Sequence, residues 1–422
     1  MKKKSNNLKK NLKKKDLHER PQRYLHSIFI IHLLINIKLK TSASFRAIAK
    51  IAVIININFN LSLKIPSHET VIIWVEKIGY YHLARPKPPA DDWIIILDHS
   101  VSIGQKKLFV IYGIRESDIN FNRPIKLSDL TPLRQICKKK WSGEIISSIL
   151  SELKNELHHI IYAVGDHGSD IKKGLKLSEI PHVHDVTHRV ALILEKLYKQ
   201  DAEYQELSKK LSHMRMTIGQ TDISHFLPNK QRTKSRYLNI NIISDFSINM
   251  LKYLDRTDDE KVIEKFNWLK EYCSLIEELD QIRKVVFKIE KVVKTNGLNS
   301  KTIKKCDKLL NVLSTPKAIQ LKEKVTVYLY NTLNLLSDRK CILCTSDIIE
   351  SAFGKYKNYI SCNSMAGITR LALCLSAFTA SLSKYEIREA LENTKMQDLK
   401  KWTADNIGIT LYQKRKIAFA GL

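Results

Sequence analysis

Apolar runs of strand length alternate with helix-like segments between residues 93 and 199, and this alternation limits the possible folds more than any other feature of the sequence. A helix is predicted at 143–158, and another follows the last strand at 187–198. Strands that alternate with helices indicate an α/β domain with a mixed or parallel sheet. The predicted strands are WIIILDHSV (93–101), KKLFVIYGI (106–114), HIIYAVGDHG (159–168) and PHVHD (181–185).

Residues 200–340 show helical periodicity only, with charged faces, as in the long stretch at 266–293. Further helices are predicted at 345–358 and 366–392. The sequence therefore predicts an α/β core in two parts, residues 91–199 and 341–422, that is interrupted by an all-α insertion.

The amino-terminal residues divide into a basic arm, a helical domain and a stiff linker. Residues 1–23 contain three lysine clusters and almost no apolar side chains, which is too little to form a core. This arm either contacts phosphates without sequence preference or is a solvated tail. Residues 24–84 predict helices, and the proline-rich residues 85–90 cannot continue a helix and so mark a linker.

Two helical stretches within residues 24–84 fit a helix-turn-helix domain. The first ends near Ile55, and the second begins at Pro66 and Ser67 and ends at Gly79. If the second helix enters the major groove, the exposed residues of its first turn lie nearest to DNA; these are Ser67, His68 and Thr70. Any small helical hairpin gives a similar pattern.

Charge indicates the kind of partner that this chain binds. The 71 Lys and Arg residues outnumber the 43 Asp and Glu residues, which gives a net charge of +28. A surplus of this size favours a polyanion, and nucleic acid is expected ahead of an anionic membrane surface. The 7 cysteines are an odd number, which argues against a disulfide framework and for a reducing compartment.

Two further patterns are interpreted as ordinary structure. Cys341 and Cys344 form a CxxC, but no second pair or nearby histidine completes a zinc site. The apolar run at 28–39 imitates a secretory signal, yet His32 and Asn36 interrupt it and it is shorter than the ~20 residues of a membrane helix. We therefore expect neither a zinc site nor a membrane segment.

Two aspartates stand at the ends of predicted strands. Asp98 follows WIIIL, and Asp166 follows the run IIYAVG. Carboxylates at the ends of neighbouring strands can converge on a hard cation such as magnesium or manganese. Two such ions can support the in-line transfer of a phosphoryl group. Aspartates at strand ends also occur as caps or loop residues.

A third carboxylate, Glu350, lies near the start of a helix predicted from Thr345, Ser346 and Asp347 as possible caps. Lys357 follows it by two helical turns and so shares its side of the helix. A metal-binding glutamate and a phosphate-binding lysine could face one substrate. Alternatively, both belong to a solvated charged face.

In this order of motifs the chain resembles the DDE transposases with an RNase H-like catalytic core. In that family the first aspartate lies on the first strand, the second lies just after the fourth strand, and the glutamate lies on a late helix. The sequences LDHS, AVGDHGSD and SDIIESAFGKYK stand in those places. The resemblance covers residues 40–410 and implies that Asp98, Asp166 and Glu350 hold two Mg²⁺ or Mn²⁺ ions, with Lys357 as the basic residue typical after the glutamate.

Further motifs resemble family members with helical insertions, including Mutator-like, hAT-like and bacterial insertion-sequence enzymes. Asp185 and His188 match a signature of Cys or Asp, two residues, then His, to which the family assigns an ordering role; a helix-capping Asp with a satisfied His is the alternative. Trp268 could stack on a base, but its apolar spacing favours the core. Asp170 is an alternative to Asp166, although a role in capping the following helix is preferred for it.

The resemblance implies a transposase that cleaves transposon-end DNA and then joins the freed 3′-hydroxyl to target DNA. Double-stranded DNA, both transposon ends and target, is the expected partner, and a homodimer or larger assembly on DNA is expected. If the source is a prokaryote, the expected location is cytoplasmic and nucleoid-associated. The alternatives are an inactive transposase-derived DNA-binding protein and an RNase H-like nuclease that does not join strands.

Overall fold

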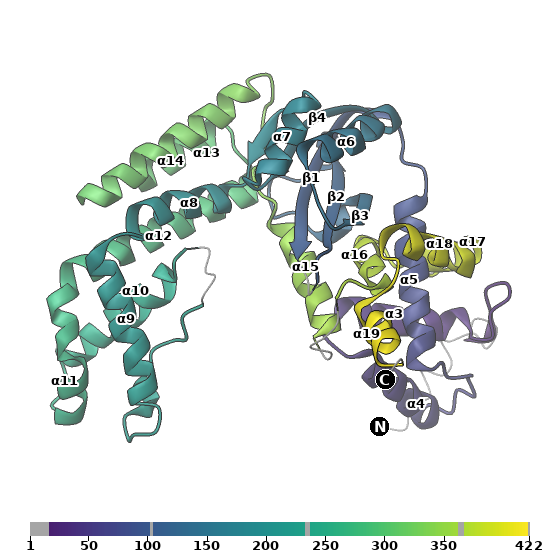
Figure 1. The fold of residues 1–422 in the computed structure, drawn as a ribbon, viewed down its shortest axis with the longest axis horizontal. Coiled ribbons are helices and arrows are strands. Elements are labelled where there is room, and N and C mark those ends of the chain that lie inside the picture. The colour runs from purple at the N-terminus through teal and green to yellow at the C-terminus, as the bar shows by residue number, and fades with distance from the viewer. Residues whose placement is uncertain (1–16, 102–103, 233–236, 362–366, 421–422) are drawn as a thin grey trace, which may run out of the picture. The chain divides into compact units, whose positions relative to one another are not determined.

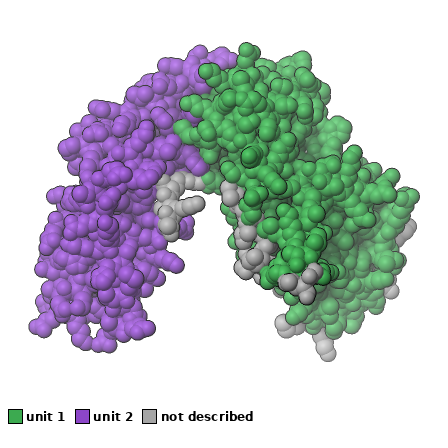
Figure 2. All heavy atoms as spheres, in the orientation of Figure 1, with its two compact units in different colours: residues 1–119, 125–182, 346–422 green, residues 120–124, 183–345 purple. Residues whose placement is uncertain are grey.

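The computed structural model describes residues 17–101, 104–232, 237–361 and 367–420. The chain divides into two compact units, which Figure 2 shows in different colours. Unit 1 contains residues 1–119, 125–182 and 346–422, and unit 2 contains residues 120–124 and 183–345. None of the described helices is both long enough and apolar enough to cross a membrane.

A five-stranded mixed sheet has the order β3-β2-β1-β4-β5. The central strand β1 pairs with β2 in antiparallel and with β4 in parallel, and β2 pairs with β3 in antiparallel. β1 is buried from Trp93 to Leu97, as expected for a strand that is covered on both faces. The strands are β1 (Ala90–Val101), β2 (Lys107–Arg115), β3 (Thr131–Lys138), β4 (His158–Gly165) and β5 (His182–His184).

Different helices cover the two faces of the sheet. The side chains of Trp93, Ile95 and Leu97 form a core with α6 (Gly143–Leu157) and α7 (Ser169–Leu177). On the other face, the hydroxyl of Tyr112 donates to the carbonyl of Leu375 in α16. The helix α15 also packs on β1 and lies beside its carboxyl end (Figure 1). The bounds of the last two helices are α15 (Asp347–Ile360) and α16 (Cys374–Ala377).

The helix α5 lies at the centre of the helical part of unit 1. It packs against helices from both ends of the chain, and Val71, Val75 and Ile78 have no exposed surface. Gly79 permits the closest approach, because a Cβ atom there would lie 1.9 Å from the carbonyl oxygen of Leu373. The helices around α5 (His68–Ala84) are α3 (Ile28–Lys40), α4 (Phe45–Asn58), η5 (Arg370–Leu373), α17 (Lys384–Asn393) and α18 (Met396–Asn406), and α19 (Leu411–Phe419) ends the chain.

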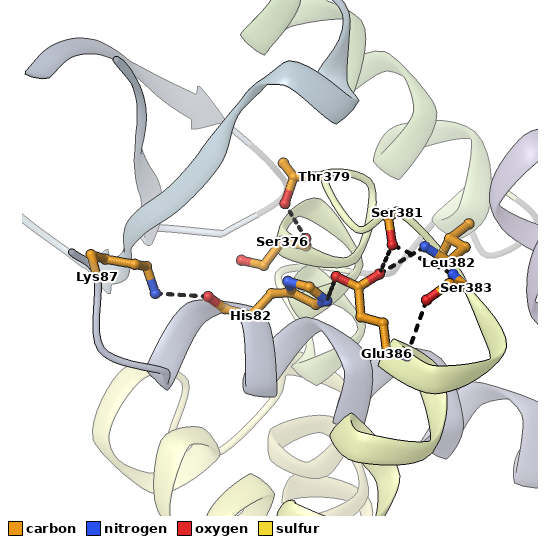
Figure 3. A network of polar contacts seen from close by, with 8 residues as sticks. All are labelled: His82, Lys87, Ser376, Thr379, Ser381, Leu382, Ser383 and Glu386. Carbon is orange, nitrogen blue, oxygen red and sulfur yellow. Dashed lines mark hydrogen bonds and ion pairs between the residues drawn. The ribbon is translucent and has the colours of Figure 1, made fainter. Parts of the chain in front are cut away.

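A polar network joins the end of α5 to α17 (Figure 3). The His82 Nε2 atom lies 3.2 Å from Oε1 of Glu386, and Oε2 of Glu386 accepts the N–H of Leu382 at 2.9 Å. Lys87, in the predicted linker, donates to the carbonyl of His82 at 2.8 Å. Burial lowers the pKa of Lys87 to about 8. The network therefore fixes the linker residue to the end of α5 by satisfying its last carbonyls.

Unit 2 is helical, and its described residues between 200 and 340 contain no strand. It holds the whole predicted insertion, and it also takes in α8, which the sequence assigned to the core. α8 belongs there because it packs on α12 and α14. The elements are α8 (Val186–Tyr198), α9 (Ala202–Thr217), η3 (Ser224–Phe226), α10 (Ile240–Leu254), α11 (Glu260–Phe266), η4 (Asn267–Tyr272), α12 (Cys273–Asn296), α13 (Ser300–Leu310) and α14 (Pro316–Leu335).

The structure confirms an α/β fold with a mixed sheet, and it adds β3, which the sequence did not predict. Pro132 and the polar residues Arg134 and Gln135 interrupt the apolar pattern of this strand. Such residues are tolerated because β3 is an edge strand. Between β2 and α6 the chain also forms two short 3₁₀ helices, η1 (Glu116–Asp118) and η2 (Leu127–Asp129).

Candidate active site

The sheet places Asp98 and Asp166 side by side. β1 and β4 run parallel, and Leu97 of β1 is the register partner of Gly165 of β4. The residue after each partner is an aspartate, so the two Cα atoms are expected roughly 5 Å apart, the distance between neighbouring strands. Both aspartates are half-buried.

The pair fits the donor set of a hard divalent cation, because it offers carboxylate oxygens that are neither fully solvated nor fully buried. A complete cage is not formed: within the described residues, no group of three His, Cys, Asp or Glu side chains is arranged to hold a metal ion. The two aspartates are therefore the part of the predicted triad that the backbone register brings together.

Glu350 lies in the first turn of α15, the helix that packs on β1. It is half-buried, whereas Lys357 on the same helix is exposed. A carboxylate in a first turn is also stabilised by the positive end of the helix dipole. The structure thus brings the helix that carries Glu350 to β1, and the catalytic role of Glu350 stays a prediction.

His99 is the neighbour of Asp98 and lies on the opposite face of β1. Its ring is paired across the strands with Phe109, at a centroid distance of 4.8 Å, and lies 5.2 Å from the ring of Trp141. Burial lowers the pKa of His99, while Asp170 and Asp166 act in the opposite direction. The imidazole is therefore within electrostatic reach of both aspartates.

Asp170 does not cap α7, because Gly168 is the N-cap residue and Asp170 lies in the first helical turn. Its Oδ2 atom lies 3.1 Å from Nε2 of His99, which is an ion-pair distance without the alignment of a hydrogen bond. A Cβ atom at Gly168 would lie 3.0 Å from Oδ1 of both Asp166 and Asp170. A side chain at this position would therefore press against both carboxylates.

His182, in β5, adds a second histidine beside the strand end. A Cβ atom at Gly165 would lie 3.7 Å from its Nε2 atom. Burial lowers the pKa of His182 to about 4. The imidazole is neutral at pH 7 and adds no positive charge beside Asp166.

Asp185 and His188 lie in unit 2. Asp185 is fully buried and caps α8, because its Oδ1 atom accepts the backbone N–H of His188 at 2.9 Å. Asp185 therefore has the helix-capping role that was one of the two alternatives from the sequence. Their role in ordering an active site stays a prediction.

Ser67, His68 and Thr70 form the start of α5. The Ser67 Oγ atom caps the helix by accepting the N–H of Thr70 at 3.2 Å. Ser67 is exposed, and the other two residues are half-buried. The first turn is accessible while the body of α5 is buried, so the helix-turn-helix domain and its contacts with DNA stay predictions.

The CxxC of Cys341 and Cys344 lies in unit 2, as does Trp268, whereas the apolar run at 28–39 lies in α3 of unit 1. Cys344 is buried, and Cys341 donates to the carbonyl of Asn296 at 3.2 Å. Trp268 is half-buried, and its indole N–H donates to the carbonyl of Lys265 at 2.8 Å.

Sequence reasoning missed His99, His182 and Trp141 as neighbours of the candidate site. A histidine inside the apolar run WIIILDHSV was a usable signal, because a polar side chain in a buried strand needs a partner. Trp141 carried no such signal, since its ring reaches the site only through the turn that follows β3.

No protein-family model matches this chain, and no curated protein matches its sequence. A solved structure with a related arrangement is the Drosophila P element transposase strand transfer complex. The two chains share 11% identity, and the match covers 94% of this chain and 99% of that chain with a TM-score of 0.44. A likeness this distant does not bear on activity.

Proposed function

We propose that this protein is a DDE-type DNA transposase that cleaves transposon-end DNA and joins the freed strand to target DNA. The observation that carries the proposal is the register of β1 and β4, which sets Asp98, within β1, beside Asp166, the residue after the end of β4. Support also comes from the order of elements. Because β3 precedes it, Asp166 follows the fourth strand of the sheet, the place that the resemblance implies for the second aspartate.

In this proposal Asp98, Asp166 and Glu350 hold two divalent cations, Mg²⁺ or Mn²⁺. When bound, such cations activate an attacking hydroxyl and stabilise a leaving oxygen in phosphoryl transfer. The sheet holds the two aspartates at fixed spacing, and α15 brings Glu350 toward them. Lys357, exposed two turns further along α15, contacts a DNA phosphate.

DNA binding is proposed from charge. The net charge of +28 gives the chain a strong attraction for a polyanion. In unit 2 the exposed face of α13 carries four lysines, opposite a face buried in the unit. These lysines are Lys301, Lys304, Lys305 and Lys308. We propose that this face follows a DNA backbone, and that the first turn of α5 contacts a transposon end.

The test is a cleavage and joining assay with duplex DNA that carries the sequences bordering the protein's own gene. With Mg²⁺, the wild type should nick at the border and produce strand-transfer species. The Glu350→Gln variant should lose both products, while Glu152→Gln, an exposed position on α6, should retain them. Equal activity of Glu350→Gln and the wild type would contradict the proposal.

The same assay separates the two alternative functions. Cleavage without joined products would indicate a nuclease that hydrolyses DNA only. Binding of the border DNA without cleavage in the presence of either Mg²⁺ or Mn²⁺ would indicate a transposase-derived DNA-binding protein.

A further inference from the structure

A side-chain contact joins the two segments that carry the proposed metal-binding aspartates. His99 follows Asp98 in β1, and Asp170 lies in the turn of α7 that follows Asp166. The His99 Nε2 atom lies 3.1 Å from Oδ2 of Asp170. The contact therefore links the end of β1 to the segment after β4, just beyond the last register pair of the two strands.

The surroundings of His99 leave its ring little freedom. Its side chain is only 13% exposed, and it contacts the rings of Phe109 and Trp141, whose centroids lie 4.9 Å from each other. Trp141 is fixed in turn, because its indole N–H donates to the carbonyl of Lys107 at 3.2 Å. The backbone N–H of His99 also contacts Oδ1 of Asp98 at 2.6 Å. A displacement of His99 would thus be passed directly to the carboxylate of Asp98.

The oxygens of Asp170 and Asp166 are used differently. Asp170 accepts the N–H of Ile171 on Oδ1 at 2.9 Å and faces His99 with Oδ2. Asp166 accepts the N–H of Gly168 on Oδ1 at 2.9 Å, and among the described residues no donor bonds to its Oδ2. Both oxygens of Asp170 are therefore engaged by protein, while Asp166 keeps one that can bind a cation.

We infer that His99 and Asp170 form a positioning pair, in which Asp170 orients the imidazole and His99 holds the end of β1 against the turn after β4. The pair sets the spacing of Asp98 and Asp166, and Asp170 is not itself a metal ligand. The inference rests on the proposed function, since it concerns the metal site proposed there. Residues that orient metal ligands typically affect metal affinity by about 10–100-fold.

Binding of Mn²⁺ to the full-length protein, followed by the electron paramagnetic resonance signal of free Mn²⁺, tests the pair without requiring DNA cleavage. His99→Ala and Asp170→Ala should each weaken Mn²⁺ binding about 10-fold. The double variant should bind Mn²⁺ no more weakly than either single variant, because both changes remove the same interaction. Asp170→Asn should bind Mn²⁺ within about 3-fold of the wild type, because the amide removes the charge but keeps an oxygen that can contact the imidazole.

The matched control is the exposed ion pair at the other ends of the same strands. His158 Nε2 lies 3.2 Å from Oδ1 of Asp91, with both side chains largely exposed. Asp91→Ala removes a similar ion pair far from the strand ends that carry Asp98 and Asp166. It should leave Mn²⁺ affinity unchanged. Thermal unfolding of every variant shows whether a change in affinity follows simply from reduced stability.

Each of three other outcomes would contradict the inference. If Asp170→Asn binds Mn²⁺ as poorly as Asp166→Asn, and His99→Ala adds to its effect, Asp170 is a metal ligand and the inference is wrong. If the pair variants bind normally while Asp166→Asn does not, the inference is wrong and the proposed function stands. If the wild type binds no Mn²⁺, the proposed metal site fails and the inference fails with it.

Discussion

Burial keeps two histidines of unit 1 uncharged at neutral pH. His82 has almost no exposed surface, and burial lowers its pKa to about 4 although the carboxylate of Glu386 lies 3.2 Å away. His182, beside the strand end at Gly165, has a pKa of about 4 for the same reason. In the unfolded chain each would titrate near its ordinary pKa of about 6.5. Protonation therefore favours the unfolded state.

The stability of the protein should consequently fall as the pH is lowered from about 6.5 toward 4. When folding lowers the pKa of a histidine, its contribution to the free energy of unfolding is fully present above pH 6.5. This contribution is lost as the pH falls toward the pKa of the folded state. For His82 the loss is roughly 3 kcal/mol. Urea unfolding at pH 7 and pH 4 should show that His82→Asn reduces this pH dependence by about that amount.

The exposed His158 provides the comparison for this experiment. His158→Asn should leave the difference in unfolding free energy between pH 7 and pH 4 as it is in the wild type, because its side chain is 71% exposed. An unchanged pH dependence in His82→Asn would show that burial of this imidazole does not control acid stability.

At the scale of single elements, the long apolar and periodic segments could be predicted and the contacts between elements could not. The strand that contains Asp98 and the helix that carries Glu350 were both predicted, because their patterns are local. β3 was missed because Pro132 and its polar neighbours hide an edge strand. The sequence also predicted an aspartate after the apolar part of each strand, but the pairing of His99 with Asp170 depends on a register between strands about 70 residues apart in the chain.

The helix α5 is a second example of an element whose local features were predictable and whose packing was not. Its period and its first turn were evident in the sequence, and Ser67 caps it as expected, but the predicted end at Gly79 is wrong, because the helix continues to Ala84. Its burial by helices from the carboxyl-terminal part of the chain was not predictable, since those contacts join residues far apart in sequence. A helix that looks amphipathic in isolation can be covered on most sides in the folded domain.

The close contact of α5 with η5 makes a prediction about stability. Gly79→Ala should lower the free energy of unfolding by about 3 kcal/mol, because its Cβ atom would overlap the backbone of Leu373. Gly354→Ala is a matched control in α15, where a Cβ atom would meet nothing within 4 Å. That change should raise stability by about 0.5–1 kcal/mol, as expected for alanine in a helix. Equal effects in a denaturant titration would refute the proposed contact.

The lysine face of α13 makes a prediction about DNA binding. Changing Lys301, Lys304, Lys305 and Lys308 together to glutamine should weaken binding to duplex DNA. It should also reduce the slope of log affinity against log salt by about 0.9 for each phosphate that the variant no longer neutralises. Fluorescence anisotropy at several salt concentrations measures both quantities. The same four positions changed to arginine keep the charge, and this variant should bind like the wild type; a glutamine variant with an unchanged slope would exclude this face.

At the scale of the whole molecule, the chain combines an α/β unit that carries all the proposed catalytic carboxylates with a helical unit that is inserted into its sequence. Asp98, Asp166 and Glu350 belong to unit 1, although residues 183–345 separate the last of them from the others in the chain. We propose that unit 1 uses a divalent cation held by Asp98 and Asp166 to break a phosphodiester bond. Binding of the cation depends on the ligand atoms of these side chains, and single substitutions can change those atoms one at a time.

Cleavage of the border DNA by Asp98→Cys in Mg²⁺ and in Mn²⁺ tests this claim most directly. A thiolate is a poor ligand for the hard Mg²⁺ ion and a better one for the softer Mn²⁺ ion. If Asp98 binds the metal ion, the variant should lose cleavage in Mg²⁺ and regain part of it in Mn²⁺, while the wild type is active in both. Wild-type cleavage by Asp98→Cys in Mg²⁺, or an equal loss in the two ions, would contradict a metal-binding role for Asp98.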